Sequence, residues 1–259
     1  MQNHSVESGE SKRKISFFLI YALVLLAIVL AGFTPSLYLR LGFDVPPIPF
    51  YLHIHGAILT GWFVWLVAQA WLVQAGNPGL HRKLGAFAAT YGLLVVVGAL
   101  MATFNAVERD LAQGVTFDTS MAEIAPEVGG ELSYLNFIRG VVWGNITGAT
   151  TFAVLLVAAV LFRGHPDVHK RLVLIATVSI IGPALARIAR WEILGGEQGP
   201  FIPLALLTLL AAIAIYDMFA LRRVHMATVM AVAFAITLRA LGSMASRSDF
   251  GTDFVRSLG

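Results

Sequence analysis

The segment RGHPDVHKR, residues 163–171, lies between two long apolar runs of this chain. Two shorter segments, HRK at 81–83 and RRVH at 222–225, also combine basic residues with a histidine where one apolar run ends and the next begins. A membrane-spanning helix needs about 20 mostly apolar residues, because each residue rises about 1.5 Å and the hydrocarbon layer is about 30 Å thick. The runs are long enough, so the sequence predicts an all-α, polytopic membrane helix bundle.

The composition supports this fold class. With 259 residues, of which 58% are hydrophobic and 13% charged, and a mean hydropathy of +0.78, the chain is not typical of soluble globular proteins. We expect one transmembrane domain of about seven helices at 15–246, a disordered cytoplasmic tail at 1–14 and a short extracytoplasmic tail at 247–259. The expected spans are roughly 15–39, 49–75, 84–106, 136–162, 171–194, 201–221 and 225–246.

The distribution of Lys and Arg predicts the orientation. Cytoplasmic loops of membrane proteins carry an excess of basic residues. With the N-terminus in the cytoplasm, ten basic residues lie inside, namely Lys12, Arg13, Lys14, Arg82, Lys83, Arg163, Lys170, Arg171, Arg222 and Arg223. Four lie outside, namely Arg40, Arg109, Arg247 and Arg256. The connection at 107–135 is acidic, as suits an outer loop, and we expect a short surface helix within 118–132.

Several functional classes can be set aside. The chain has no cysteine, which excludes disulfides, thiolate metal sites, iron–sulfur clusters and thioether attachment of haem. Retinal-based light chemistry is disfavoured, because the lysines at 12, 14, 83 and 170 all lie outside the seventh span. Signals for a P-loop, a serine nucleophile or a dinucleotide-binding fold are missing. The formal charge of +3 reflects basic residues at helix ends rather than a nucleic-acid partner.

Three histidines stand where apolar runs begin at the inner face: His81, His169 and His225. The positive end of a helix dipole disfavours imidazolium, so a histidine there tends to stay neutral and able to ligate. If the three helices adjoin, the three imidazoles would share one metal ion, or two of them would hold a haem iron. The alternative is that they anchor the helices in the headgroup layer. His165, four residues before His169, gives only a weak metal-site signal.

A second group of candidates lies in the outer half of the spans. His55, followed by Gly56, is favoured over His53 as a functional residue, because residues two apart on a helix point in opposite directions. Arginines within spans are costly and usually mark function. Together with His55 and Arg239, the arginines of the outer half would form a pocket for a carboxylate, a phosphate or a haem propionate. The alternative is that their side chains extend to the outer headgroups. The anion-binding candidates are Arg139, Arg187 and Arg190.

Two further features of the spans bear on packing. Trp62, Trp65 and Trp71 recur along one helix, which favours packing or lipid contact over a cofactor site. Pro183 predicts a kink that frees backbone carbonyls near Arg187. We expect Arg187 to be buried against Glu192, His55 or a bound anion.

These motifs carry a resemblance. The string formed by HIHG at 53–56, LHRKLG at 80–85, HKRL at 169–172 and RVH at 223–225, together with Trp62 and Gln69, resembles a broad family of uncharacterised bacterial polytopic membrane proteins. The resemblance runs from about 50 to 230 and implies a multi-pass protein of the bacterial cytoplasmic (inner) membrane. The placement of histidines at helix ends is also loosely similar to membrane b-type cytochromes, although here the strongest cluster lies on one face.

The leading functional hypothesis is a membrane redox protein. Its histidines would bind haem b or a first-row transition metal, with His55, His81, His169 and His225 as cofactor-binding candidates, and its arginines would hold propionates or an anionic substrate. The expected partners are the lipid bilayer and a quinone or another small anionic or lipophilic molecule. The alternatives are a transporter of anions or lipids and an accessory or assembly subunit without a cofactor, and the residues do not decide whether the protein is an enzyme.

Overall fold

The computed structural model describes residues 15–43, 47–126, 132–191 and 198–259, with no account of the side chains of 198–200. It is built from helices, with a single isolated antiparallel bridge between Ser120 and Ser133 in the described residues. The helices are α1 (Phe17–Phe33), η1 (Thr34–Tyr38), η2 (Arg40–Gly42), α2 (Phe50–Gln74), α3 (Pro78–Gly85), α4 (Ala88–Ala112), α5 (Met121–Ile124), α6 (Tyr134–Leu161), α7 (Pro166–Ser179), α8 (Gly182–Ala189), α9 (Gln198–Leu221), α10 (Met226–Arg247) and α11 (Asp249–Arg256).

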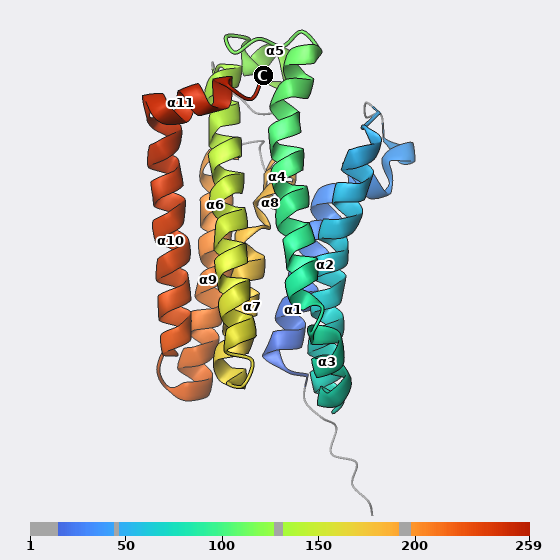
Figure 1. The fold of residues 1–259 in the computed structure, drawn as a ribbon, viewed down its shortest axis with the longest axis vertical. Helices are drawn as coiled ribbons and strands as arrows, with labels where there is room; N and C mark the ends of the chain where they lie inside the picture. The colour runs from blue at the N-terminus through green and yellow to red at the C-terminus, as the bar shows by residue number, and fades with distance from the viewer. Residues whose placement is uncertain (1–14, 44–46, 127–131, 192–197) are drawn as a thin grey trace, which may run out of the picture.

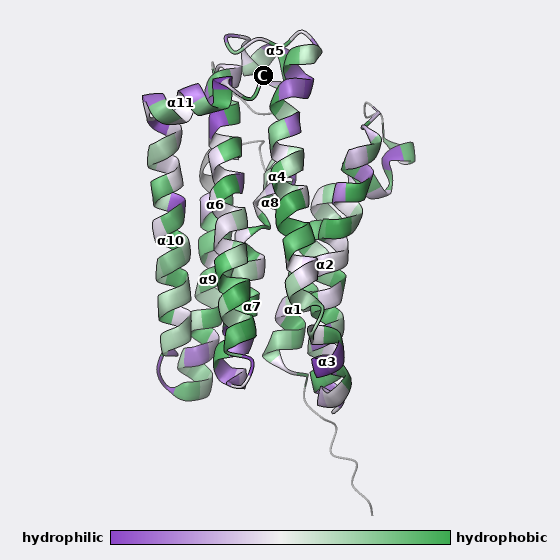
Figure 2. Cartoon of the chain, in the orientation of Figure 1, coloured by the Kyte–Doolittle hydropathy of each residue, from purple (hydrophilic) through white to green (hydrophobic). Residues whose placement is uncertain are grey.

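The expected membrane bundle is confirmed. In the described residues, six helices are long and apolar enough to cross a membrane, and α7 with α8, bent by 47°, makes a seventh if this pair is counted as one span. Polar residues gather at the two ends of the bundle and apolar residues lie between them (Figure 2). We call the end that holds α3 and the α6–α7 and α9–α10 turns the inner end, and the end that holds α5 and α11 the outer end (Figure 1).

Local sequence signals begin the helices at the inner end. Ser16 caps α1 by accepting the Leu19 N–H, and the Asn77 side chain caps α3 in the same way from Leu80. Proline stands in the first turn of α3, α7 and α8, where its missing N–H costs nothing. Gly76 has φ of 77°, a value that favours glycine, and it reverses the chain between α2 and α3.

The broken span lies in the middle of the bundle. α7 packs against α6, α9 and α10, while α8 packs against α1 and α9. α2 and α4 complete the bundle on the far side of α1, and α4 returns to pack against α6 (Figure 1). α7 is accordingly buried along most of its length, so any side chain that it carries inward is shielded from lipid.

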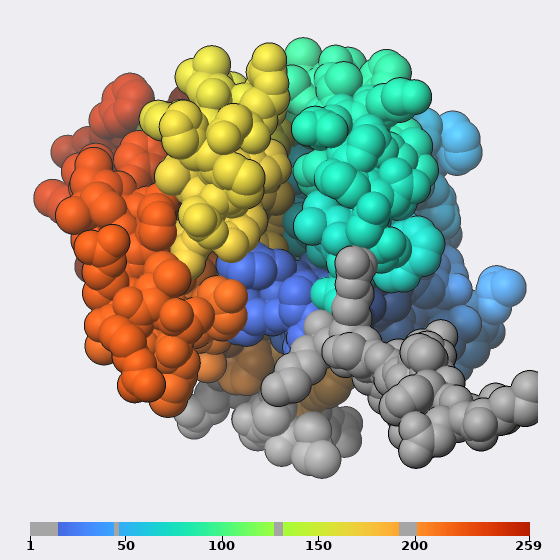
Figure 3. Space-filling view, turned by 90° about the horizontal axis from the view of Figure 1, so that it is seen from below, coloured from blue at the N-terminus to red at the C-terminus, as the bar shows by residue number. Residues whose placement is uncertain are grey.

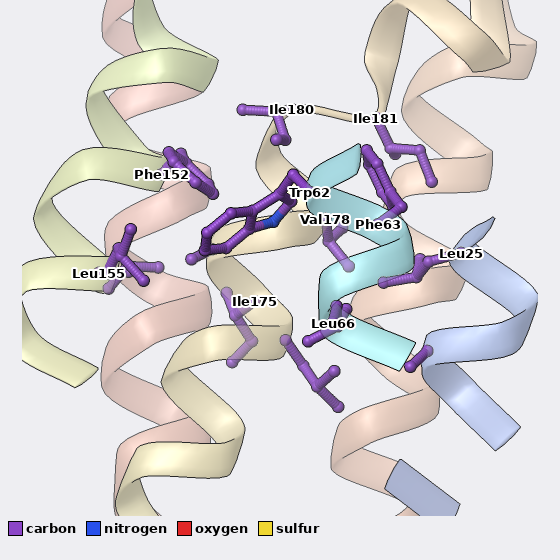
Figure 4. Packing of buried hydrophobic residues seen from close by; sticks show 14 of the residues in the cluster. Leu25, Trp62, Phe63, Leu66, Phe152, Leu155, Ile175, Val178, Ile180 and Ile181 are labelled. Carbon is purple, nitrogen blue, oxygen red and sulfur yellow. The ribbon is translucent and has the colours of Figure 1, made fainter. Parts of the chain in front are cut away.

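The core is centred on Trp62 (Figure 4). Its side chain is 2% exposed, its ring lies edge-on to Phe152 at 4.9 Å, and its Nε1–H donates to Thr177 Oγ1 at 3.2 Å. Trp62 is therefore a packing residue that joins α2, α6 and α7. Trp71 is 57% exposed on the same helix, so its contact with lipid stays a prediction.

The kink expected at Pro183 is present between α7 and α8. Two glycines let neighbouring helices approach it. A Cβ on Gly148 of α6 would lie 2.6 Å from the Ser179 carbonyl oxygen, and a Cβ on Gly32 of α1 would meet the Ala184 carbonyl oxygen at 2.5 Å. Small residues allow such close backbone packing in membrane helices.

The outer loop, the C-terminal tail and the starts of two spans can be compared with the sequence expectation. α5 provides the short helix expected within 118–132. Residues 247–259, expected as a short extracytoplasmic tail, include α11, which is capped by Ser248 and buries Val255. The third span begins at Ala88 because 78–85 form a separate helix, and the fifth begins at Pro166, because proline favours the first helical turn.

Candidate functional site at the inner end

Two of the three inner histidines lie side by side. The ring centres of His81 on α3 and His169 on α7 are 6.3 Å apart, with the ring planes at 81°. Both side chains are half-buried. Seen from the inner end, α3 and the α6–α7 turn lie on either side of a narrow recess, with the start of α1 behind it (Figure 3). The short helix α3, which the sequence did not predict, is what carries His81 to this place.

The hydrogen bonds of the two rings fix which nitrogens are free. His169 Nδ1 lies 2.8 Å from the Ala159 carbonyl oxygen. A carbonyl only accepts, so Nδ1 carries the proton and, in the neutral ring, Nε2 has the lone pair. A histidine that ligates a metal is usually held in this way through its other nitrogen. His81 Nδ1 is buried and has no hydrogen-bond partner in the described part of the chain.

The surroundings of His81 keep it neutral. Burial lowers the pKa of the His81 imidazole, and the nearby His169 and Arg82 lower it further, while the Gln69 backbone carbonyl acts in the opposite direction. A neutral imidazole has a lone pair to offer to a metal or to a proton.

Gln69 adds a buried amide at this depth. Its side chain is 9% exposed, and neither Oε1 nor Nε2 has a hydrogen-bond partner among the described residues. Trp62 and Thr177 are in contact across the antiparallel helices α2 and α7. Seven residues further along α2 and seven back along α7, Gln69 is level with Lys170, next to His169. Unpartnered buried polar atoms are rare and require an explanation.

The third histidine has another role. His225 is the N-cap of α10, where its Nδ1 accepts the Ala227 N–H at 3.1 Å. The expectation that His81, His169 and His225 share one metal ion finds no support, because the described residues contain no group of three His, Asp or Glu side chains that could hold a metal. His165 is exposed and lies against Phe162.

A buried ion pair that was not predicted from the sequence lies beside His225. Arg171 and Asp217 are 1% and 0% exposed and are joined by two-pronged hydrogen bonds from the guanidinium. Asp217 also accepts the Thr228 hydroxyl at 2.6 Å and the His225 backbone N–H at 3.1 Å. The network ties α7 to α9 and α10. A single aspartate within an apolar span was the signal, since such a charge needs a partner.

The outer candidates His55, Arg187 and Arg190 lie near one another, since Arg187 is within electrostatic range of both others. His55 is half-buried and its Nδ1 bonds the Gly98 carbonyl at 2.9 Å, so it links α2 to α4, within electrostatic range of Arg187. The Arg187 guanidinium lies 4.2 Å from the Phe33 ring centre and donates to the Pro183 carbonyl. The described contacts of Arg187 are thus protein groups, while Glu192, one of its expected partners, lies outside the described residues. Arg139 and Arg190 are half-buried, and their anion-binding role stays a prediction.

Comparison of the chain with protein-family models, with curated proteins and with solved structures found no match. The resemblance to bacterial polytopic membrane proteins and to b-type cytochromes therefore stays an expectation, and function has to be argued from the residues.

Proposed function

We propose that this integral membrane protein is a haem-binding redox protein in which His81 and His169 are the two axial ligands. The observation that carries the proposal is the pairing of these imidazoles at 6.3 Å between ring centres. Two imidazoles on opposite sides of one metal, each with a nitrogen about 2 Å from it, have ring centres roughly 6 Å apart. The spacing is that of a pair ready to hold one ion between them.

The donor set favours haem over a bare metal ion. A first-row metal bound by protein alone needs three or four donors. The described residues contain no group of three that could hold one. A porphyrin brings four nitrogens of its own, so two imidazoles complete the coordination.

The protein residues have distinct tasks in this proposal. The Ala159 carbonyl holds His169 in the tautomer with a free Nε2. Burial keeps His81 neutral, as its lowered pKa indicates. The unpartnered Gln69 amide is placed to hydrogen-bond the cofactor or a lipophilic substrate. Arg82 and Lys83, exposed beside His81, are placed to meet propionates. Bound haem supplies a one-electron couple, and electron exchange with a membrane quinone is the expected use.

The test is the absorption spectrum and haem content of protein expressed with haem supply and purified in detergent. Wild type is expected to show a Soret band, and His81→Ala and His169→Ala are expected to lose at least about 90% of the haem at equal protein yield. His225→Ala and His165→Ala are matched controls at the same end and should keep it.

Two outcomes would reject the proposal. One is wild-type protein that stays colourless even after haem is added. The other is a double variant, His81→Ala with His169→Ala, that keeps its haem. A loss confined to His225→Ala would instead restore the third histidine as a ligand.

A further inference from the structure

The break between α7 and α8 has two arginines beside it, in the outer half of the bundle. Arg187 extends back along α8, and its Nη1 reaches the Pro183 carbonyl oxygen at 3.1 Å. Arg239 extends from α10, and its Nη1 reaches the Gly144 carbonyl oxygen of α6 at 3.0 Å. The Arg239 Nη2 atom lies 3.7 Å from the position of a Cβ on Gly182, the first residue of α8. Both guanidiniums therefore lie beside residues 182–183.

The depth of these charges is costly. Arg239 is the fourteenth residue of α10, so it lies about 20 Å along the helix from the inner end, well within the hydrocarbon layer. Arg187 is enclosed by the Phe33 ring of α1 and by its own helix. A charged side chain at such depth usually pairs with an opposite charge or lines a functional site.

Neither guanidinium has a carboxylate partner in the part of the chain that the structure describes. The salt bridges there join Arg109 to Asp110, Lys170 and Arg171 to Asp167, and Arg171 to Asp217. Within the described ranges, each of the two outer arginines has a hydrogen bond to a backbone carbonyl, and the Phe33 ring is a further contact of Arg187. These residues leave most of the hydrogen-bonding capacity of the two side chains unused, because a guanidinium has five N–H groups.

The helix break adds to the positive field. A discontinuous membrane helix presents the N-terminus of its second half at mid-membrane depth, and that end carries partial positive charge. Here the end of α8 faces the guanidinium of Arg239 across Gly182, which has no side chain to separate them. Two positive groups in contact within a membrane are stable together when an anion lies near both.

We propose that the α7–α8 break binds an oxyanion group, a phosphate or a carboxylate, with Arg187 and Arg239 as its countercharges. An apolar tail on the ligand would lie against apolar side chains such as Phe33. The site therefore suits the head group of an anionic amphiphile as well as a small free anion. The site is distinct from the histidine pair and does not depend on haem. It includes Arg187 of the anion-binding group expected from sequence, while the roles of Arg139 and Arg190 stay a prediction.

The test is thermal unfolding of the full-length protein in a neutral detergent, followed by tryptophan fluorescence, with three probes. Dioleoyl phosphatidic acid carries a phosphate and two tails, dioleoylglycerol carries the same tails alone, and inorganic phosphate carries the charge alone. A ligand at 100 times its Kd is expected to raise the Tm by at least about 4 °C. Phosphatidic acid should do so and dioleoylglycerol should not. A shift with inorganic phosphate as well would identify a free anion as a sufficient ligand.

Arg187→Gln and Arg239→Gln should each remove most of this shift. Arg247→Gln is the matched control, because Arg247 lies on the same helix as Arg239 but is exposed at the outer end. If a Gln variant is not folded, the corresponding Lys variant keeps the charge but loses the paired donors, and it should raise the probe concentration for half-maximal shift about tenfold.

The proposal is overturned if wild type shows no shift with phosphatidic acid or phosphate, or if the shift survives in Arg187→Gln and Arg239→Gln alike. It is also overturned if the Lys variants used in their place reach the half-maximal shift at the wild-type probe concentration. None of these readouts depends on a Soret band, so failure of the haem proposal and failure of the anion proposal are separate results.

Discussion

The two ends of the broken span treat buried charge in opposite ways. At the inner end, Arg171 of α7 is matched by Asp217, and the carboxylate is saturated by further donors. In the outer half, the described contacts of Arg187 on α8 and of Arg239 are backbone carbonyls and an aromatic ring. The comparison teaches that the presence of a buried arginine says little about function. What distinguishes a structural arginine from a binding one is whether the protein supplies its partner.

The orientation of the bundle in the membrane, inner end toward the cytoplasm, should give the largest effect. Alkaline phosphatase fused after Lys83 should be inactive, because that position follows the basic inner turn, and fused after Gly114 it should be active in the periplasm. A cytoplasmic reporter at the same positions should give the reverse pattern. The difference is expected to be nearly all-or-none, and equal activity at both positions would disprove the topology.

The buried ion pair should give the largest effect on stability. Asp217→Ala leaves the Arg171 charge without its partner in the protein interior, which typically costs about 3–5 kcal/mol of unfolding free energy. Asp167→Ala is the comparison variant, because the Asp167 side chain is 69% exposed and pairs closely with Lys170 at 2.6 Å and only distantly with Arg171 at 3.7 Å, and exposed pairs are worth about 0–1 kcal/mol. The measurement is unfolding in mixed micelles. Equal effects of the two variants would show that the inner network is not a structural lock.

The sequence predicted this inner network only in part. Long apolar runs and their basic ends were sufficient to predict the fold class and the approximate spans. The bilayer constrains the length of each apolar run and the charge at its ends, and both are read directly along the sequence. The sequence also identified Arg187 as a buried charge in need of a partner. The pairing of Arg171 with Asp217 was not predictable, since Arg171 was interpreted as a topology signal and Asp217 follows it by 46 residues. Only the packing of α7 against α9 brings the two together.

The histidines show a similar limit. Equal depth was the reason for grouping His81, His169 and His225, and depth alone does not fix which way a side chain faces. The Asn77 cap and Gly76 create α3 and set His81 beside His169, whereas His225 is the N-cap of α10.

The packing around the break should give the next effect. Gly148→Ala and Gly32→Ala would each place a methyl group against a backbone carbonyl, at 2.6 Å and 2.5 Å, and backbone there cannot move without shifting α7 or α8. Overpacking of this kind typically costs about 1–3 kcal/mol. Gly140→Ala is the control, because nothing lies within 4 Å of its added Cβ, and alanine there should be neutral or slightly stabilising. If the three alanine variants unfold alike, the close approach at the break is not needed for stability.

The smallest effect concerns the pH dependence of the cofactor-free protein, and it tests the environment of His81 without the haem proposal. Burial and the nearby His169 and Arg82 lower the His81 pKa, against the opposing Gln69 carbonyl. Below about pH 6.5 an unfolded histidine takes up a proton that folded His81 resists, so the unfolded state binds more protons and stability falls as the pH drops. We expect the Tm of wild type to decrease from pH 7 to pH 5 more steeply than that of His81→Gln, which cannot titrate. The difference should be modest, because the ring is half-exposed and solvent screens it. A wild type that becomes more stable than the variant on acidification would mean that His81 gains a proton on folding, and its neutral, ligand-ready state would then be wrong.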